Sequence, residues 1–92
     1  MTERERFEAE ETKRRLIAAH PVCEVCGRMP SSQLAHRIPQ TRKNLQRFGK
    51  TIIHHPLNLA AVCSLRCNAR VLIEHKPREK EALAEKIRRE IA

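Results

Sequence analysis

The sequence is poor in aromatic residues: it has no Trp, no Tyr and only two Phe among 92 residues. Large rings usually anchor the cores of small proteins, so this chain needs another source of stability. Its apolar residues, 40% of the total, are enough for one small core, and the length leaves no room for a second independent domain. Proteins that bind single-stranded nucleic acid stack the bases on exposed aromatic rings, so the scarcity of such rings here argues against that class.

Long apolar runs are also missing. No segment approaches the roughly 18 residues that a membrane span requires, so no membrane partner is expected. The first residues, MTERER, are densely charged and lack the apolar segment of a secretory signal. We therefore expect a cytoplasmic protein whose cysteines stay reduced, a setting in which cysteine pairs bind metal more often than they form disulfides.

Basic residues outnumber acidic ones by 19 to 11, which gives a formal net charge of +8. Residues 1–22 are neutral, residues 23–75 carry +6 and residues 76–92 carry +2. A basic central segment predicts a polyanionic partner, and nucleic acid is the commonest one. Because rings are scarce, contacts with the backbone of double-stranded DNA are favoured. The alternative is a basic surface that serves only solubility.

Helices are predicted at both ends of the chain. Residues 2–19 contain no Gly or Pro, pair opposite charges at helical spacing and end before Pro21; their thin apolar stripe predicts light docking. Residues 77–91 begin with Pro and repeat apolar residues every four positions. We expect one domain with an N-terminal helix (1–20), a central unit (21–75) and a C-terminal amphipathic helix (76–92).

The central unit reads as strand, loop, strand and helix. Residues 32–38 and the β-branched residues 51–55 predict two strands, each ending at a proline. Residues 42–50 join them as a basic loop or short helical turn, and residues 64–75 repeat apolar residues at helical spacing. The predicted fold class is therefore a small α+β protein.

Four cysteines form two close pairs, Cys23 with Cys26 and Cys63 with Cys67, separated by 36 residues. Two tight turns that each supply two thiolates are how a chain builds a tetrahedral zinc site, and Gly27 frees the first turn to fold. Four thiolates leave no open coordination position, so we expect a structural Zn2+ that adds to the small core. An iron–sulfur cluster, a redox pair and two disulfides are the alternatives; the last two need a βαβ pattern or an oxidising compartment.

Histidine and asparagine residues lie between the cysteine pairs and just after them. An imidazole accepts a proton from water near neutral pH, so His36 is a candidate general base. Asn58, in a turn before an apolar run, can bridge backbone groups and hold a facing histidine, and the side-chain oxygen of Asn68 suits a hard divalent cation. Each also has a structural explanation, as a strand histidine, a turn asparagine or a helix-start asparagine.

Taken in order, AHRIP (35–39), NLAAVC (58–63) and CN (67–68) resemble the HNH endonucleases of the ββα-metal fold with zinc-bound cysteine knuckles. The resemblance covers residues 22–75. It implies a ββα-metal core with a structural four-cysteine zinc site. It also implies a metal-dependent hydrolase that cuts DNA phosphodiester bonds and leaves a 5′-phosphate.

The resemblance also implies residue roles, as an H-N-N variant of the family. His36 is the general base that activates water, Asn58 orients His36 and locks the loop, and Asn68 is a ligand of a catalytic Mg2+ or Mn2+. The family often has a metal ligand just before the first histidine, where this chain has Ala35. His54 or His55 could supply the missing ligand, and we take His55 as the candidate; either imidazole could instead lie at the surface or contact phosphate.

Because Ala35 cannot bind metal, weak or lost activity is part of this expectation. A zinc-stabilised nucleic-acid-binding module without catalysis is the first alternative, and a zinc-knuckle protein-interaction module is the second. The expected DNA contacts are the basic residues around the first candidate histidine and in the following loop. They are Arg37, Arg42, Lys43, Arg47 and Lys50.

Overall fold

Two short antiparallel strands form the centre of the molecule in the computed structural model, which describes residues 2–92. Over this range the chain has five α-helices, one 3-10 helix and one two-stranded sheet, which confirms the predicted α+β class. The elements, in chain order, are α1 (Glu3–Ala19), β1 (Gln33–His36), α2 (Arg42–Phe48), α3 (Lys50–Ile53), the 3-10 helix η1 (Pro56–Asn58), β2 (Leu59–Val62), α4 (Leu65–Val71) and α5 (Pro77–Ile91).

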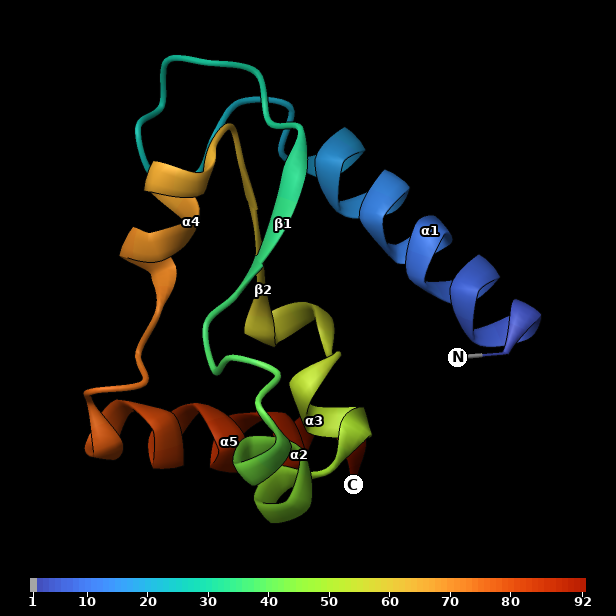
Figure 1. Cartoon of the computed structure of the whole chain (residues 1–92), viewed down its shortest axis with the longest axis vertical. Coiled ribbons are helices and arrows are strands. Elements are labelled where there is room, and N and C mark those ends of the chain that lie inside the picture. Colours follow the sequence, from blue (N-terminus) through green and yellow to red (C-terminus); the bar gives the residue numbers. More distant parts are fainter. Residues whose placement is uncertain (1) are drawn as a thin grey trace.

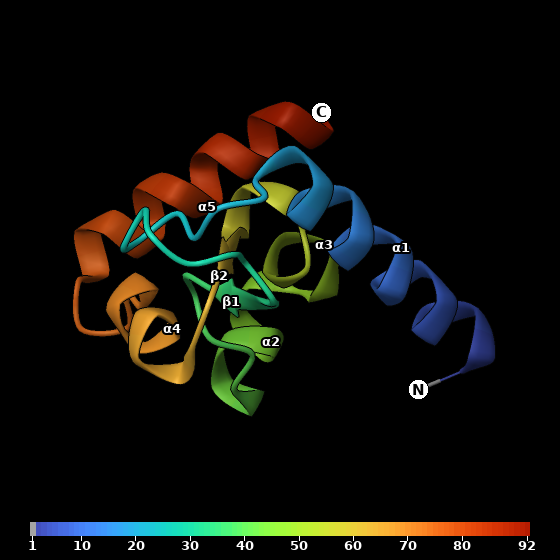
Figure 2. The same cartoon turned by 90° about the horizontal axis from the view of Figure 1, so that it is seen from above.

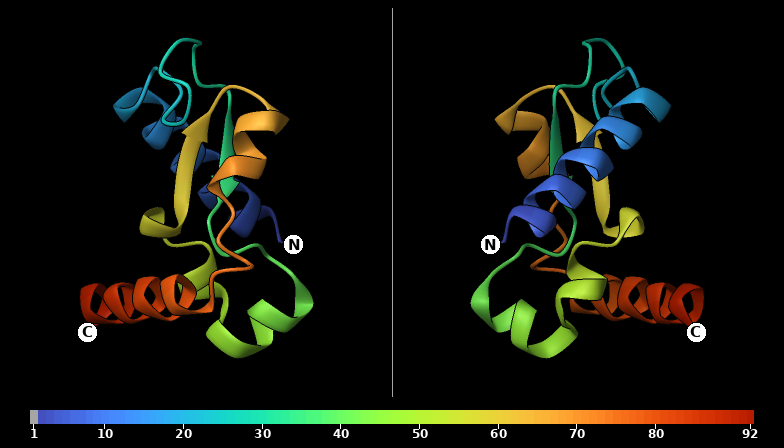
Figure 3. Two further views of the ribbon diagram at one scale, coloured as in Figure 1. Left: turned by 90° about the vertical axis from the view of Figure 1, so that its left-hand side faces the viewer. Right: turned by 90° about the vertical axis from the view of Figure 1, so that its right-hand side faces the viewer.

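The hairpin is covered by a different helix on each face. Helix α1 lies on one side of β1 and β2 and α4 on the other, while α5 runs beneath the hairpin beside α2 and α3 (Figures 1 and 2). The side views show α1 crossing one face of the strands and α4 the opposite face (Figure 3). No helix within residues 2–92 combines the length and apolarity needed to cross a bilayer.

The register of β1 decides which side chains meet which helix. Gln33 pairs with Val62 and His36 pairs with Leu59, so successive residues of β1 point to opposite faces. Ala35 is fully buried against α4, whereas His36 lies in a hollow beside α1. The alternation therefore buries Ala35 in the core and leaves His36 in the open hollow.

The prediction of a second strand over residues 51–55 is wrong. Lys50–Ile53 forms the helix α3, which the chain enters through Gly49 with a φ of 85°, a conformation that glycine adopts without strain. Ile52 and Ile53 are buried against α5 instead of pairing in a sheet. The strand that pairs with β1 is β2, in which all four residues are buried. A strand buried on both faces shows no alternation, so periodicity does not reveal it.

The other predicted elements form with shorter bounds or as helices. The first strand covers Gln33–His36 instead of 32–38, and α4 ends at Val71 instead of near residue 75 because Leu72 is extended. The basic segment 42–50 forms α2 and the start of α3. Helix α1 contains no buried residue, as its thin apolar stripe predicts.

The buried apolar residues form two clusters. The first joins the hairpin, α4 and the cysteines, and comprises Cys23, Ala35, Ala60, Val62, Cys67 and Val71. The second joins α2, α3 and α5, and comprises Ile38, Phe48, Ile52, Ile53, Ala84 and Ile87. Each cluster is small, so the link between them matters for the stability of the whole chain.

Asn58 lies between the two clusters, at the junction of β1, α3 and β2. Its side chain is fully buried, its Oδ1 accepts from the backbone N–H of Ile38 at 2.8 Å, and its Nδ2 donates to the carbonyl oxygens of Ile38 and Ile53 at 3.0 and 2.8 Å. Its backbone carbonyl accepts from the N–H of Arg37 at 2.8 Å. One amide therefore fastens the end of β1 to the end of α3 at the start of β2.

We predict that Asn58→Ala lowers the free energy of unfolding by about 3–5 kcal/mol, because it leaves buried backbone groups of Ile38 and Ile53 without partners. The measurement is chemical denaturation of the metal-loaded protein. Asn68→Ala is the matched control, since Asn68 is half-buried and its contact with Gln33 is long at 3.4 Å. Equal losses in the two variants would contradict the role assigned to Asn58.

Candidate functional site

The four cysteines converge as the spacing predicts. Their Sγ atoms all lie within 4.8 Å of one another, and Cys63 Sγ is 3.7 Å from both Cys26 Sγ and Cys67 Sγ. Thiolates bound to a tetrahedral Zn2+ at about 2.3 Å lie about 3.8 Å apart. The cluster therefore matches the dimensions of a four-cysteine zinc site, and all four residues are free cysteines.

The first cysteine turn favours thiolates. Burial opposes ionisation of Cys23, but backbone N–H groups of Cys26 and Val25 point at its sulfur, and together the backbone donors lower the pKa of Cys23 to about 6. The backbone N–H groups of Arg28 and Met29 lower the pKa of Cys26 in the same way. Amides directed at sulfur stabilise the charged ligands that a metal ion needs.

The second cysteine pair is less readily ionised without an ion. The Ser64 hydroxyl favours the Cys63 thiolate, but burial and hydrogen bonds with the neighbouring thiols raise the pKa of Cys63 to about 11. The side chain of Ser64 also accepts from the backbone N–H of Cys67 and so caps α4. Zn2+ would neutralise the crowded thiolates, and an ion held by these residues would join the first turn to the hairpin and α4.

The first turn is also docked on the sheet by its backbone. Glu24 donates its N–H to the carbonyl of Ala61 at 2.9 Å and accepts the N–H of Ala61 on its carboxylate at 2.5 Å. The exposed edge of β2 is therefore paired at this point, and Cys23 and Cys26 are brought beside the end of β2, where Cys63 follows.

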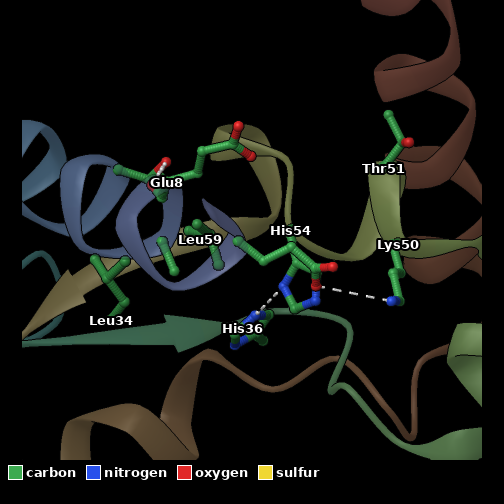
Figure 4. Close-up of a pocket in the computed structure, with 10 residues that line it drawn as sticks. Glu8, Leu34, His36, Lys50, Thr51, His54 and Leu59 are labelled. Carbon is green, nitrogen blue, oxygen red and sulfur yellow. Dashed lines mark hydrogen bonds and ion pairs between the residues drawn. The ribbon is translucent and has the colours of Figure 1, made fainter. Parts of the chain in front are cut away.

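His36 lies at the end of β1 and faces His54, which follows α3. The two rings meet edge to face with centroids 5.4 Å apart, and His36 Nε2 is 3.3 Å from His54 Nδ1 (Figure 4). Burial and the nearby His54 lower the pKa of His36 below its ordinary value of about 6.5. His36 is therefore neutral at pH 7 and keeps a lone pair that can take up a proton.

The two histidines line an open hollow of about 550 Å³ between the hairpin, α1 and α3. Leu34 and Leu59 form its apolar floor, and Glu8 of α1 and Lys50 and Thr51 of α3 lie around it (Figure 4). Glu5 also lines the hollow, with a carboxylate oxygen 4.0 Å from Lys50 Nζ. The hollow thus combines imidazole, ammonium and carboxylate groups at the surface.

Asn58 fixes the backbone beside both histidines instead of touching their rings. Its partner Ile38 lies two residues after His36, and its partner Ile53 lies directly before His54. His55, the predicted cation ligand, uses its Nδ1 to accept the N–H of Leu57 at 3.1 Å and so caps η1. His54, not His55, is the neighbour of His36.

The expected Mg2+ or Mn2+ site near Asn68 is not supported by the donor atoms. Ala35, buried against α4, offers no ligand, and Asn68 donates its Nδ2 to Gln33 Oε1 at 3.4 Å. Within residues 2–92, the cysteine cluster is the one group of three or more His, Cys, Asp or Glu residues whose ligand atoms converge. His36 and Asn68 also face opposite sides of the hairpin.

The predicted DNA-contacting residues differ in whether they form ion pairs within the chain. Arg47 pairs with Glu81, and Lys50 lies 4.0 Å from Glu5. Arg42 and Lys43 are exposed in the first turn of α2, and no carboxylate of the described chain lies within ion-pair distance of either. Cations in the first turn oppose the helix dipole, so helix stability does not explain them.

Sequence reasoning did not separate the roles of His54 and His55. Both are adjacent, and the predicted strand would have pointed them to opposite faces. Because this segment is a helix that ends at Ile53, His54 follows it into the hollow and His55 caps the next turn. Recognising Gly49 as a break between two short helices was the signal that could have distinguished them.

No protein-family model, curated protein sequence or solved structure is significantly similar to this chain. The resemblance to HNH endonucleases therefore rests on the residues and their arrangement alone.

We predict one Zn2+ per chain and loss of cooperative folding when it is removed. Structural zinc contributes about 10–16 kcal/mol of apparent binding free energy, comparable with the whole stability of a small domain. The measurement is metal content by mass spectrometry, together with thermal unfolding before and after chelation and after Zn2+ is restored. An unchanged melting temperature in the metal-free protein, kept reduced, would contradict the prediction.

Proposed function

We propose that this chain is an HNH-type DNA endonuclease with a structural zinc site and with His36 as its general base. The observation that carries the proposal is the neutral His36 imidazole in an open hollow at the end of β1. Support comes from the order of β1, β2 and α4 around the cysteine cluster, because a ββα unit with this motif order is what the resemblance implies. The basic central segment supports DNA as the substrate.

In the proposed reaction His36 removes a proton from a water molecule that attacks the phosphorus of a DNA phosphodiester. The P–O3′ bond breaks, the leaving 3′ oxygen takes a proton from water, and the products are a 5′-phosphate and a 3′-hydroxyl. His36 then releases its proton to solvent. His54 is a positioning residue, since its ring nitrogen holds the His36 ring by the 3.3 Å contact. Lys50 lines the same hollow and would attract the phosphate charge. Asn58 keeps the backbone beside both histidines fixed.

Ala35 favours a second candidate, a zinc-stabilised module that binds DNA without cutting it. Within residues 2–92, no group of three or more His, Cys, Asp or Glu ligands other than the cysteines converges, so no such group forms at Asn68. Hydrolysis in the HNH family depends on a divalent cation. Both candidates share the zinc site and the basic surface, so only an assay of cleavage separates them.

We predict that the zinc-loaded protein nicks supercoiled plasmid in the presence of Mn2+ or Mg2+ and that His36→Ala slows nicking by about 10²–10⁴-fold, the usual contribution of a positioned base. Only neutral His36 can act as a base, and its pKa lies below the ordinary histidine value of 6.5. As the pH falls, the nicking rate should therefore drop to half its plateau only below pH 6.5.

His75→Ala is the control, because His75 is exposed between α4 and α5 and away from the hollow. Folding of each variant is checked by zinc content and thermal unfolding. Wild-type protein that binds plasmid but never nicks it, with either cation, would favour the binding module instead.

We also predict that reversing the charge of Arg42 and Lys43 weakens binding to duplex DNA of any sequence and flattens its dependence on salt, because fewer counterions are released. The measurement is fluorescence anisotropy with two unrelated duplexes over a range of salt concentrations. Arg88→Glu with Arg89→Glu, the same charge change near the end of α5, is the matched control and should have the smaller effect. Equal effects of the two pairs would show that only net charge matters.

A further inference from the structure

The contact between His36 and His54 has the dimensions of a pair of metal ligands. His36 Nε2 and His54 Nδ1 are 3.3 Å apart. Two imidazole nitrogens bound at about 2.0–2.1 Å to one tetrahedral ion lie about 3.3–3.4 Å apart. A separation of 3.3 Å is already longer than the roughly 2.7–3.2 Å typical of N–H···O hydrogen bonds, so the contact is a weak one and little is lost when an ion replaces it.

The surroundings favour a cation and allow it to enter. His54 is exposed, and the hollow that both rings line is open to solvent. Glu5 and Glu8 of α1 border the same hollow and lower the cost of bringing positive charge to it, while Lys50 opposes this effect and is offset by its proximity to Glu5. Because the hollow is open, water can complete the coordination shell of an ion held by two histidines.

We infer that His36 and His54 form a second metal site, one that takes a borderline divalent ion such as Zn2+, Co2+, Ni2+ or Cu2+. Imidazole nitrogen prefers these ions, whereas Mg2+ prefers oxygen ligands. Both rings bind as neutral imidazoles. The ring that donated the shared hydrogen moves it to its other nitrogen, so each ligand atom presents a lone pair and no net proton is required.

This site is separate from the cysteine cluster and from the face of the hairpin that α4 covers. His36 points toward α1, whereas Ala35, Cys67 and Val71 pack together on the other face. With Nε2 bound to the ion and the ring hydrogen on Nδ1, His36 would have no lone pair left to act as a base. Resting on the proposed function, this means that excess Zn2+ should inhibit cleavage, even though one Zn2+ is needed for folding.

The test is isothermal titration of the full chain, already loaded with one Zn2+ per molecule, with further Zn2+. We expect one additional ion per chain, and we expect His36→Gln or His54→Gln to weaken its binding by about tenfold or more, as loss of a ligand does. His75→Ala should bind the second ion within about twofold of wild type. Millimolar Mg2+ should not displace it.

Nitrogen chemical shifts give a readout that does not depend on activity. Zn2+ should shift the ¹⁵N signals of His36 Nε2 and His54 Nδ1 and leave those of His75 unchanged. The inference is overturned if no second ion binds, if His54→Gln binds it as tightly as wild type, or if Mg2+ competes equally with Zn2+. Because binding is measured without DNA, an inactive nuclease with an intact second site refutes only the proposed function.

Discussion

The side-chain amide of Asn58 is the contact on which the rest of the structure depends. It is fully buried and hydrogen-bonds the backbone of Ile38 and Ile53, which are themselves fully buried. A buried amide without partners would cost several kcal/mol, so the three segments that it joins must stay in register. This register also sets the positions of His36 and His54, because each lies within two residues of a backbone group that is hydrogen-bonded to Asn58. The asparagine thus acts on the histidine pair through the backbone.

The core is divided into two clusters, and the four cysteines that could hold a metal ion belong to the first. One cluster contains small residues such as Ala35 and Ala60 together with cysteines, and it buries little apolar area by itself. The other cluster is built from larger residues, namely Phe48 and four isoleucines together with Ala84, and it contains no candidate metal ligand. Zn2+ held by four thiolates would stabilise the first cluster, while the Asn58 amide joins the backbones of Ile38 and Ile53 within the second. The two clusters therefore compensate for the scarcity of aromatic residues in different ways: the first through a candidate metal site, the second through branched aliphatic side chains.

The sequence predicts the parts of this structure that depend on local signals. The end helices, the cysteine cluster and the bridging role of Asn58 all have such signals in capping, spacing or turn position. The second strand was misplaced because Thr51, Ile52 and Ile53 have high strand propensity, yet burial against α5 and the turn at Gly49 make them helical. Strand β2 was missed because it is buried on both faces. Because residues 51–55 were assigned to a strand, the direction of the His54 side chain, and so its contact with His36, could not be predicted.

The alternation of β1 also separates two kinds of chemistry. On the face toward α4, polar groups such as Gln33 and Asn68 bond to each other, and Ala35 leaves no ligand between them. On the face toward α1, two imidazoles keep their nitrogens directed at one point in an open hollow. Helix α1 buries none of its residues, so few apolar contacts hold it over that hollow. The weak docking of α1 therefore leaves the His36 and His54 rings accessible on this face of the hairpin.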